Sequence, residues 1–286
     1  MKKLLTILSL IPFVSYAGVR HYNASVEQSS WKLGEATRLQ CSLTHPIDGY
    51  GNAVFSSRAG KQLNMEFELD MLSLPDTYSV ANVYAVPPKW MPGAMQRPIA
   101  EMAIRKQYNG DVPKKMAWTM LSELEKGYWP TIYYQDWYND NDQVAVGLNA
   151  SNFEPAYREF VQCVSGLLHF SFDDIEYTVL NYKKNSSELT RQSQKKLGMI
   201  SDYLAQDQDM ELVLVDAYTD SYGSPDRNRQ LSEQRANSIK DFFTEKGVDA
   251  ARIEVTGHGE RRHIADNRNE LSRAKNRRVV IRMDKP

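Results

Sequence analysis

The sequence has 286 residues, of which 42% are hydrophobic and 25% charged, and its formal net charge is -1. This length accommodates two domains, and this composition is typical of packed globular protein and excludes a largely disordered chain. A nearly neutral chain is not expected to bind nucleic acid or anionic lipid through its overall charge.

The first 17 residues have the pattern of a secretory signal peptide. Two lysines precede an apolar run, and residues 15–17 (Ser-Tyr-Ala) match the small-x-small pattern of a cleavage site, so we expect cleavage after Ala17. The alternative is an uncleaved anchor, which needs about 20 apolar residues, but this run is shorter and contains Pro12. The first cysteine is Cys41, so no lipidation site follows the run. We expect an exported, periplasmic mature chain without a transmembrane segment.

Two cysteines, Cys41 and Cys163, occur in this chain. An exported protein folds in an oxidising compartment, so a disulfide between them is the expected state. Two buried thiols are the alternative.

Residues 18–165 are predicted to form a mainly β domain with a few helices. Strand-like runs include "MEFELDML", and "WPTIYYQDWY" followed by "QVAVGLNA" predicts a hairpin that turns at residues 139–142. The five tryptophans of the chain all fall in this part: Trp31, Trp90, Trp118, Trp129 and Trp137. The proline- and methionine-rich segment 86–98 around Trp90 is either a partner surface or packed on its own domain.

Two amphipathic helices are predicted within this first domain. In the first, apolar residues recur at helical spacing and Gly127 is the expected stop. These apolar residues are Met116, Met120, Leu121 and Leu124. The second is predicted to begin at Ser151, because Ser151 and Glu154 have the spacing of a capping box, and to place Cys163 near its end.

Residues 166–286 are predicted to form an α/β sandwich, with helices packed on a mixed sheet. The boundary lies in a segment that reads as strand or extended linker. Strands and helices then alternate, which indicates a layered arrangement. The expected elements are strand 178–183, helix 187–205, strand 211–217, helix 227–246, strand 252–257, a short helix from Glu270 and a last strand "RRVVIRM". The fold class expected for the whole chain is α+β.

A charged residue interrupts the apolar face of the predicted helix 227–246. Arg235 lies four residues from both Leu231 and Ile239, and so on the same face as they do. Asp220 ends the preceding strand, and Gly223 in the connecting turn returns the chain toward the helix.

Three interpretations of this arrangement stay open from the residues alone. Arg235 could be a snorkelling side chain that covers apolar surface. It could form a salt bridge with Asp220. If the two charges are instead held apart, they form a receptor for a zwitterion, in which the carboxylate takes an ammonium group and the guanidinium grips a carboxylate.

Four short motifs resemble the peptidoglycan-binding signature of the OmpA-like domain family, over about residues 175–284. They are "TDSYG", Asn228, "LSEQRA" and "NRRV". The resemblance implies that Asp220 and Arg235 hold the amino-acid end of diaminopimelate in the stem peptide of the cell wall. It also implies cleft positions for Thr219, Asn228, Leu231 and Asn185.

The sequence departs from this family's pattern at two places. Ala217 and Tyr218 stand where a small residue and a histidine are usual, and Tyr182 is the aromatic residue of the first strand. Both changes are expected to alter the rim of the cleft and to leave the charged pair in place.

The chain as a whole resembles the MotY family, the T-ring proteins of sodium-driven polar flagellar motors. The resemblance consists of an unlipidated export signal, an aromatic-rich first domain with one cysteine at each end, and the OmpA-like second domain. It implies that the first domain associates with the flagellar basal body and with MotX, and that the assembly helps to install the PomA/PomB stator.

Other classes of function have less support in the sequence. We find no motif of a serine hydrolase or a zinc protease and expect no enzyme and no cofactor. His258, His263 and Asp266 lack the spacing of a rigid metal site and are expected to be loop residues. The basic run at 261–278 could suggest nucleic-acid binding, but an exported protein is not expected to encounter nucleic acid. A general peptidoglycan-tethering envelope protein outside the motor is the alternative to the flagellar interpretation.

Overall fold

The computed structural model describes residues 18–139, 141–183, 186, 188–207 and 212–285. The predicted signal peptide lies outside these residues. The described chain divides into two compact units. The first comprises the residues up to Glu35, Ser42–Ser56 and Met65–Val161, and the second comprises Ala36–Cys41, Ser57–Asn64 and the residues from Gln162 onward.

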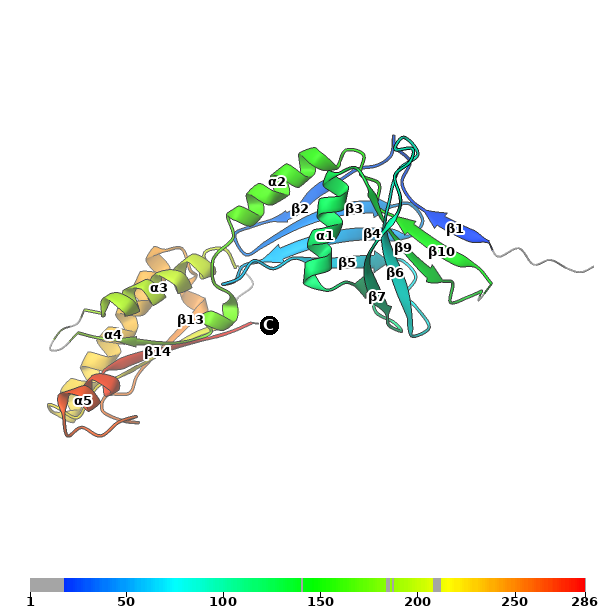
Figure 1. The fold of residues 1–286 in the computed structure, drawn as a ribbon. Coiled ribbons are helices and arrows are strands. Elements are labelled where there is room, and N and C mark those ends of the chain that lie inside the picture. Colours follow the sequence, from blue (N-terminus) through cyan, green and yellow to red (C-terminus); the bar gives the residue numbers. More distant parts are fainter. Residues whose placement is uncertain (1–17, 140, 184–185, 187, 208–211, 286) are drawn as a thin grey trace, which may run out of the picture. The chain divides into compact units, whose positions relative to one another are not determined.

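A ten-stranded sheet carries the N-terminal part of the chain (Figure 1). Its strands are β1 (Val19–Tyr22), β2 (Lys32–Ala36), β3 (Gln40–Ile47), β4 (Gly51–Arg58), β5 (Glu66–Met71), β6 (Ser79–Val86), β7 (Arg97–Ile104), β8 (Gly110–Asp111), β9 (Trp129–Gln135) and β10 (Gln143–Gly147). Their order across the sheet is β1-β10-β9-β6-β7-β8-β5-β4-β3-β2. The predicted hairpin is confirmed, because β9 and β10 pair antiparallel.

The edge strand β1 joins this sheet in a way that short-range patterns do not reveal. It pairs with β10 in parallel, with Val19 opposite Gln143 and Tyr22 opposite Val146. The first residues after the predicted cleavage site are therefore paired with a strand more than a hundred positions later in the chain.

Two helices accompany the N-terminal strands. Helix α1 (Lys114–Glu125) confirms the first prediction: Met120, Leu121 and Leu124 are buried, and Gly127 follows the helix with a φ of 83°. It packs against β5, β7 and β9 (Figure 1).

Helix α2 (Phe153–Ser165) begins two residues later than predicted. Asn152, directly before it, has a φ of 61°, so Ser151 is separated from the helix by a left-handed residue and does not cap it. Glu154 forms an ion pair with Arg158 on the next turn, with 3.2 Å between Oε1 and Nη2. The predicted capping box is therefore wrong, although the predicted helix exists.

Cys41 and Cys163 form a disulfide, as predicted. Their Cα atoms are 6.0 Å apart, and 122 positions of the chain separate them. Cys41 lies in β3 and Cys163 in the last part of α2, and both belong to the second compact unit.

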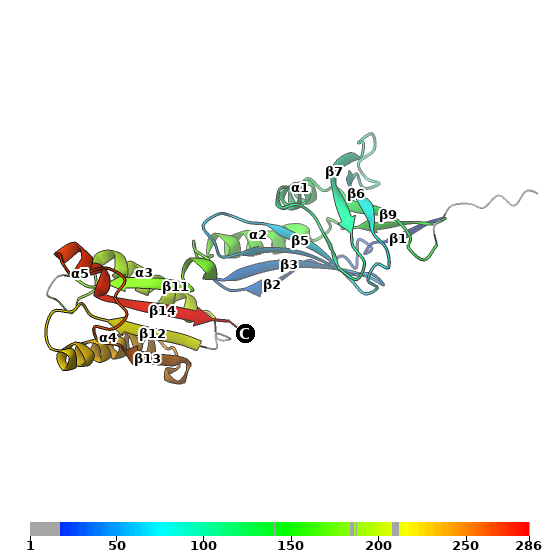
Figure 2. The ribbon, with the colours of Figure 1, turned by 90° about the horizontal axis from the view of Figure 1, so that it is seen from below.

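The C-terminal part is a four-stranded mixed sheet with helices packed against it (Figure 2). Its strands are β11 (Tyr177–Asn181), β12 (Leu212–Tyr218), β13 (Ile253–Gly257) and β14 (Arg278–Asp284), in the order β11-β14-β12-β13. Its helices are α3 (Arg191–Leu204), α4 (Pro225–Glu245) and α5 (Glu270–Asn276), with short 3-10 turns η1 (Phe172–Asp174) and η2 (Ala250–Arg252). Strands β12 and β13 are parallel, whereas β14 is antiparallel to both of its neighbours.

One apolar core lies between this sheet and its helices. Alternate residues of β12, Val213, Val215 and Ala217, point into it, as the period of two in a half-buried strand requires. Ile239 and Phe243 of α4 reach it from the helix side. This arrangement confirms the expected α+β class, with a mainly β first part and an α/β sandwich after it.

Two local features set the position of helix α4. Ser224 caps its start, because its side chain accepts a hydrogen bond from the backbone N–H of Arg227 at 3.4 Å, and Pro225 occupies the first turn. At Gly257, a Cβ atom would lie 2.5 Å from the backbone nitrogen of Glu233. Any residue other than glycine at this position would therefore clash with α4, and the absence of a side chain lets β13 lie close to the helix. The helix face that carries Arg235 is thereby held against the sheet.

Within the residues that the structure describes, no helix has the length and the apolar character needed to cross a bilayer.

Candidate functional site

A cleft of about 420 Å³ lies in the second compact unit. Its lining contains both residues of the charged pair and the cleft positions Thr219, Asn228 and Leu231. The full lining is Ser186, Thr219, Asp220, Tyr222, Gly223, Arg227, Asn228, Leu231, Arg235 and Arg277. Asn185, the remaining predicted residue, lies outside the described residues.

Asp220 reaches the cleft from the loop that follows β12. The backbone N–H of Thr219 donates to the carbonyl of Gly259 at 2.8 Å, which extends the strand direction to the edge of the cleft. Gly223 then takes a φ of 112°, a conformation that side chains with a Cβ rarely adopt, and the chain turns into α4. Asp220 and Arg235 thus face one space from two consecutive elements.

Arg235 is buried but incompletely bonded. It is 6% exposed, and its guanidinium lies 4.1 Å from the centre of the Tyr182 ring, a cation–π contact. Its Nη2 donates to the carbonyl of Ser186 at 3.4 Å, whereas Nε and Nη1 have no acceptor among the described residues. Burial lowers the pKa of Arg235, and the nearby charge of Arg277 acts in the same direction. Burial also raises the pKa of Tyr182 to about 12.

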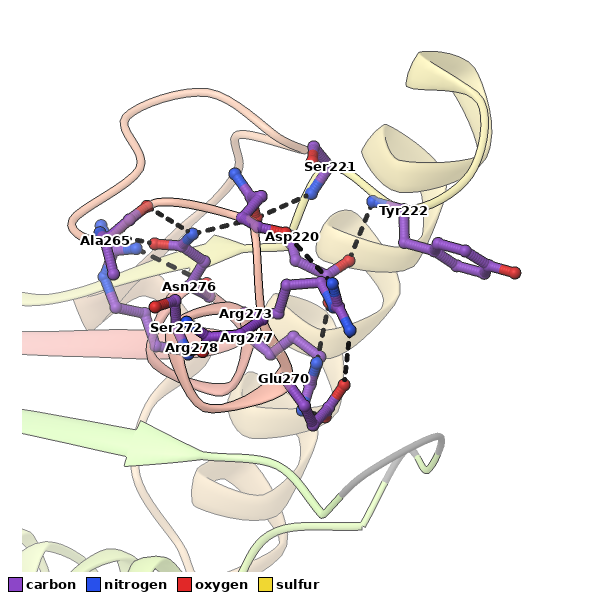
Figure 3. A network of polar contacts seen from close by, with 12 residues as sticks. Asp220, Ser221, Tyr222, Ala265, Glu270, Ser272, Arg273, Asn276, Arg277 and Arg278 are labelled. Atoms are coloured by element: carbon purple, nitrogen blue, oxygen red, sulfur yellow. Dashed lines mark hydrogen bonds and ion pairs between the residues drawn. The ribbon is translucent and has the colours of Figure 1, made fainter.

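Asp220 is paired with Arg277 (Figure 3). Its Oδ2 accepts a hydrogen bond from Nη1 of Arg277 at 2.8 Å, and its Oδ1 accepts one from the backbone N–H of Tyr222 at 3.1 Å. The other end of the Arg277 guanidinium donates to Glu270 at 2.6 Å. Burial lowers the pKa of Arg277, but the hydrogen bonds and charges of Asp220 and Glu270 outweigh this, so the pKa is raised overall.

Asn276 holds the loop beside this ion pair. Its Oδ1 accepts hydrogen bonds from the backbone N–H groups of Ile264 and Ala265 at 2.9 and 3.1 Å, and its Nδ2 donates to the carbonyl of Ala265 at 2.9 Å (Figure 3). Asn276 is fully buried, so these bonds satisfy groups that water cannot reach. The residue directly after Asn276 is Arg277, whose direction toward Asp220 depends on this anchor.

The motif "NRRV" does not by itself indicate what its two arginines contact. The structure brings Arg277 to Asp220 across 57 positions, and Arg278 over the ring of Tyr218 at 4.0 Å. Arg277 is the C-cap residue that ends α5, whereas Arg278 is the first residue of β14, so the two side chains leave the backbone from different elements. No local pattern reports which of them reaches Asp220.

The remaining predicted cleft residues have distinct environments. Asn228 is buried and donates through Nδ2 to the carbonyl of Asp220 at 3.3 Å and to Glu260 at 2.9 Å. The side-chain hydroxyl of Thr219 is buried and has no partner among the described residues. The Asn228 bonds tie α4 to the loop that carries Asp220.

The departures from the family pattern form contacts of their own. Tyr182 is the ring under Arg235. Tyr218 stacks on His258, with ring centres 4.7 Å apart, and His258 bonds Asp216 at 2.7 Å. Tyr218 therefore takes part in a stacked row on the sheet, and it does not line the cleft.

The histidines of the C-terminal loop are engaged in other interactions. His263 bonds Asn267 through Nδ1 at 2.9 Å, and His258 bonds Asp216. Within the described ranges of the chain, no three His, Cys, Asp or Glu side chains are grouped so as to hold a metal ion.

A second hollow, of about 600 Å³, lies in the first compact unit. Prolines and aromatic rings dominate its walls: Pro87, Pro88, Trp90, Trp129 and Tyr133. Trp90 is 56% exposed and meets the ring of Trp129 edge-on, with centres 5.9 Å apart. The segment 86–98 thus packs on its own domain and still presents an aromatic surface.

Comparison with known proteins assigns both parts of the chain. Residues 22–169 match the model of the MotY N-terminal domain, and residues 181–277 match that of the OmpA family. The sodium-type flagellar protein MotY of Vibrio parahaemolyticus is 42% identical over 276 residues, which cover 96% of this chain and 94% of that protein.

Other relatives match a smaller share of the chain. The outer-membrane lipoprotein YfiB of Pseudomonas aeruginosa is 44% identical over 73 residues, 26% of this chain and 44% of that protein. Among solved structures, the peptidoglycan-associated lipoprotein from Burkholderia pseudomallei matches with 24% identity and a TM-score of 0.35, covering 37% of this chain and 89% of that chain. The two family models and the similarity along nearly the whole chain agree, and the chain belongs to the MotY family.

Proposed function

We propose that this chain is a non-enzymatic component of the periplasmic T ring of a sodium-driven flagellar motor. In this proposal the C-terminal part fastens the protein to peptidoglycan, and the N-terminal part contacts MotX and the basal body. The assembly then helps to recruit and hold the PomA/PomB stator units. Membership of the MotY family supports the motor assignment, and the cleft supports attachment to the wall.

The observation that carries wall binding is the incomplete bonding of Arg235. A buried guanidinium with two N–H groups lacking acceptors is costly to maintain in a folded protein. Arg235 lines the cleft, and in this proposal a bound ligand completes the bonding of its guanidinium. A carboxylate fits best, since a planar guanidinium binds it through two parallel hydrogen bonds.

Asp220 supplies the complementary half of the receptor. Arg277 and Tyr222 each occupy one of its carboxylate oxygens, and each oxygen has a second lone pair that can accept from an ammonium group. The free end of diaminopimelate carries an ammonium and a carboxylate on one carbon atom. Such a group can bind Asp220 and Arg235 together.

The N-terminal part is proposed to determine where the protein binds. Peptidoglycan surrounds the whole cell, so the cleft cannot by itself select a flagellar base. The partly exposed Trp90 in an aromatic hollow supports a protein contact in residues 18–165, because rigid aromatic side chains concentrate at binding hot spots.

Sedimentation with purified peptidoglycan tests the wall-binding function. Asp220→Asn and Arg235→Lys in the mature full chain are each expected to abolish co-sedimentation, because losing one partner of a buried charge interaction typically costs about 2 to 5 kcal/mol. Arg229→Met is the matched control, since Arg229 lies on the same helix, is exposed and pairs with Glu233 outside the cleft. Co-sedimentation of both folded cleft variants at the wild-type level would contradict the assignment.

A general peptidoglycan-tethering protein of the periplasm, outside the motor, is the alternative. The similarity of the C-terminal part to outer-membrane proteins such as YfiB favours it. Imaging of a functional fluorescent fusion separates the two, because the motor proposal requires foci at flagellar bases and the alternative requires a uniform envelope signal.

A further inference from the structure

Tyr182 lies behind the guanidinium of Arg235 and outside the lining of the cleft. It is 5% exposed, and the centre of its ring lies 4.1 Å from Cζ of Arg235. Arg235 lines the cleft, whereas Tyr182 does not. The ring therefore contacts the guanidinium from the protein side and leaves the cleft side of the group to a ligand.

The backbone at Tyr182 is fixed by pairing with a neighbouring segment. Tyr182 directly follows β11 and forms an isolated antiparallel bridge with Leu189. Next to this bridge, the backbone N–H of Lys183 donates to the carbonyl of Glu188 at 2.8 Å. The ring itself belongs to the apolar core of the second compact unit. Tyr182 thus offers Arg235 a platform whose position does not depend on a ligand.

An aromatic ring can hold a guanidinium without using its hydrogen-bond donors. The five N–H donors of an arginine lie in the plane of the group, whereas the ring attracts the cation through its electron-rich face. A carboxylate in the same place would also orient Arg235, but it would occupy the donors and neutralise the charge that a ligand carboxylate needs. Nε and Nη1 of Arg235 have no acceptor among the described residues, so the contact with Tyr182 leaves them open.

We propose that Tyr182 is a positioning residue for wall binding, whose ring holds the guanidinium of Arg235 so that Nε and Nη1 are presented to the carboxylate of the ligand. This inference rests on the proposed wall binding and adds a residue that does not touch the ligand. The ring carries the role, and the phenolic hydroxyl is not needed for it. Arg277 has the corresponding role for Asp220, but it acts through an ion pair.

Titration calorimetry of the mature full chain with two probes tests this role. The first probe is the free tripeptide that ends in diaminopimelate, and the second carries a carboxamide in place of the carboxylate next to the free ammonium group. Tyr182→Leu is expected to weaken binding of the first probe about tenfold, the range of a buried cation–π contact. Its affinity for the second probe should change much less, because that probe lacks the carboxylate that Arg235 holds. Tyr182→Phe keeps the ring and should bind both probes as the wild type does.

A fluorinated ring separates positioning from packing. Trifluorophenylalanine incorporated at position 182 has nearly the shape of phenylalanine, but its fluorine atoms withdraw electron density from the ring face and weaken its attraction for a cation. This protein should keep its fold and bind the first probe several-fold more weakly than Tyr182→Phe does.

Ile200→Ala is the matched control for lost stability. Ile200 is fully buried in the same apolar core and does not line the cleft. Its replacement should lower the melting temperature and leave the affinity for the first probe unchanged, so that a weaker core is not mistaken for a weaker site.

Three results would overturn the inference. An equal loss for both probes with Tyr182→Leu would assign the ring to packing alone, and wild-type affinity of this folded variant for the first probe would remove any role in binding. Equal affinities of Tyr182→Phe and the fluorinated protein would show that the electrostatic contact does not hold Arg235, and this comparison decides if Tyr182→Leu does not fold. Failure of the wild type to bind the first probe would instead contradict the proposed wall binding.

Discussion

Arg277 Nη1 lies 2.8 Å from Asp220 Oδ2, and both side chains are 11% exposed. Asp220, which the resemblance to the OmpA-like family proposes as a ligand-binding residue, is therefore already paired within the protein. Arg235, the other proposed residue, has two nitrogens without an acceptor among the described residues. Asp220 thus faces the cleft already oriented by a second arginine.

The first prediction is that Arg277 positions Asp220 for wall binding. Arg277→Met should lower the free energy of unfolding by about 3 kcal/mol, because it leaves the buried Asp220 and its neighbour Glu270 without their shared cation. It should also abolish sedimentation with peptidoglycan. Chemical denaturation and sedimentation measure the two effects separately.

A double variant separates positioning from stability in this pair. Asp220→Asn combined with Arg277→Met removes both charges and should recover part of the lost stability without recovering wall binding. Wall binding by Arg277→Met at the wild-type level would show that Asp220 needs no orienting partner.

The second prediction concerns the disulfide. Opening a bond that spans 122 positions should lower the free energy of unfolding by up to about 4 to 5 kcal/mol in the chain-entropy model. Reductant should therefore lower the melting temperature of the oxidised protein. The Cys41→Ala/Cys163→Ala variant should melt at the lower temperature with or without reductant, and a response of this variant to reductant would contradict the explanation.

The third prediction is a loss of stability in mild acid caused by His45. This side chain is fully buried, stacks on Trp31, and donates through Nδ1 to the carbonyl of Ser30 at 2.8 Å. Burial lowers its pKa, against the opposing effect of the Ser30 carbonyl. The unfolded chain then binds a proton near pH 6.5 that the folded protein does not bind, so stability falls as the pH drops below about 6.5.

Replacement of His45 tests this sign. His45→Gln removes the titrating group, so its urea midpoint should lie below that of the wild type at pH 7.5, and the difference should shrink between about pH 7 and pH 5. Tryptophan fluorescence follows the transition. A difference that does not change with pH would assign the acid sensitivity to other groups.

The fourth prediction is that location and attachment separate in the cell. A fluorescent full-length protein carrying Asp220→Asn should still form foci at flagellar bases, because the proposed partner surface lies in residues 18–165. It should support weak motility, and overproduction should reduce the defect, since wall attachment adds effective concentration to the protein contacts. Diffuse fluorescence of this variant would show that the cleft itself determines location.

The sequence by itself determined the local elements and the identity of the two charged residues. Helices α1 and α4 follow from apolar spacing and a terminal glycine, and the β9–β10 hairpin follows from two strand-like runs around a polar turn. These signals are carried by residues a few positions apart, within one element. The disulfide prediction also needed only a count of two cysteines and the expectation of export.

Only the tertiary structure decided which distant residues meet. The pairing of β1 with β10, the ring of Tyr182 under Arg235, and the approach of Arg277 to Asp220 each join segments tens of positions or more apart. Alternation along a strand tells which side chains share a face, but many registers and strand orders keep that alternation intact. The choice among them comes from packing of the whole sheet against its helices, and for this reason the partner of Asp220 could not be read from the residues around it.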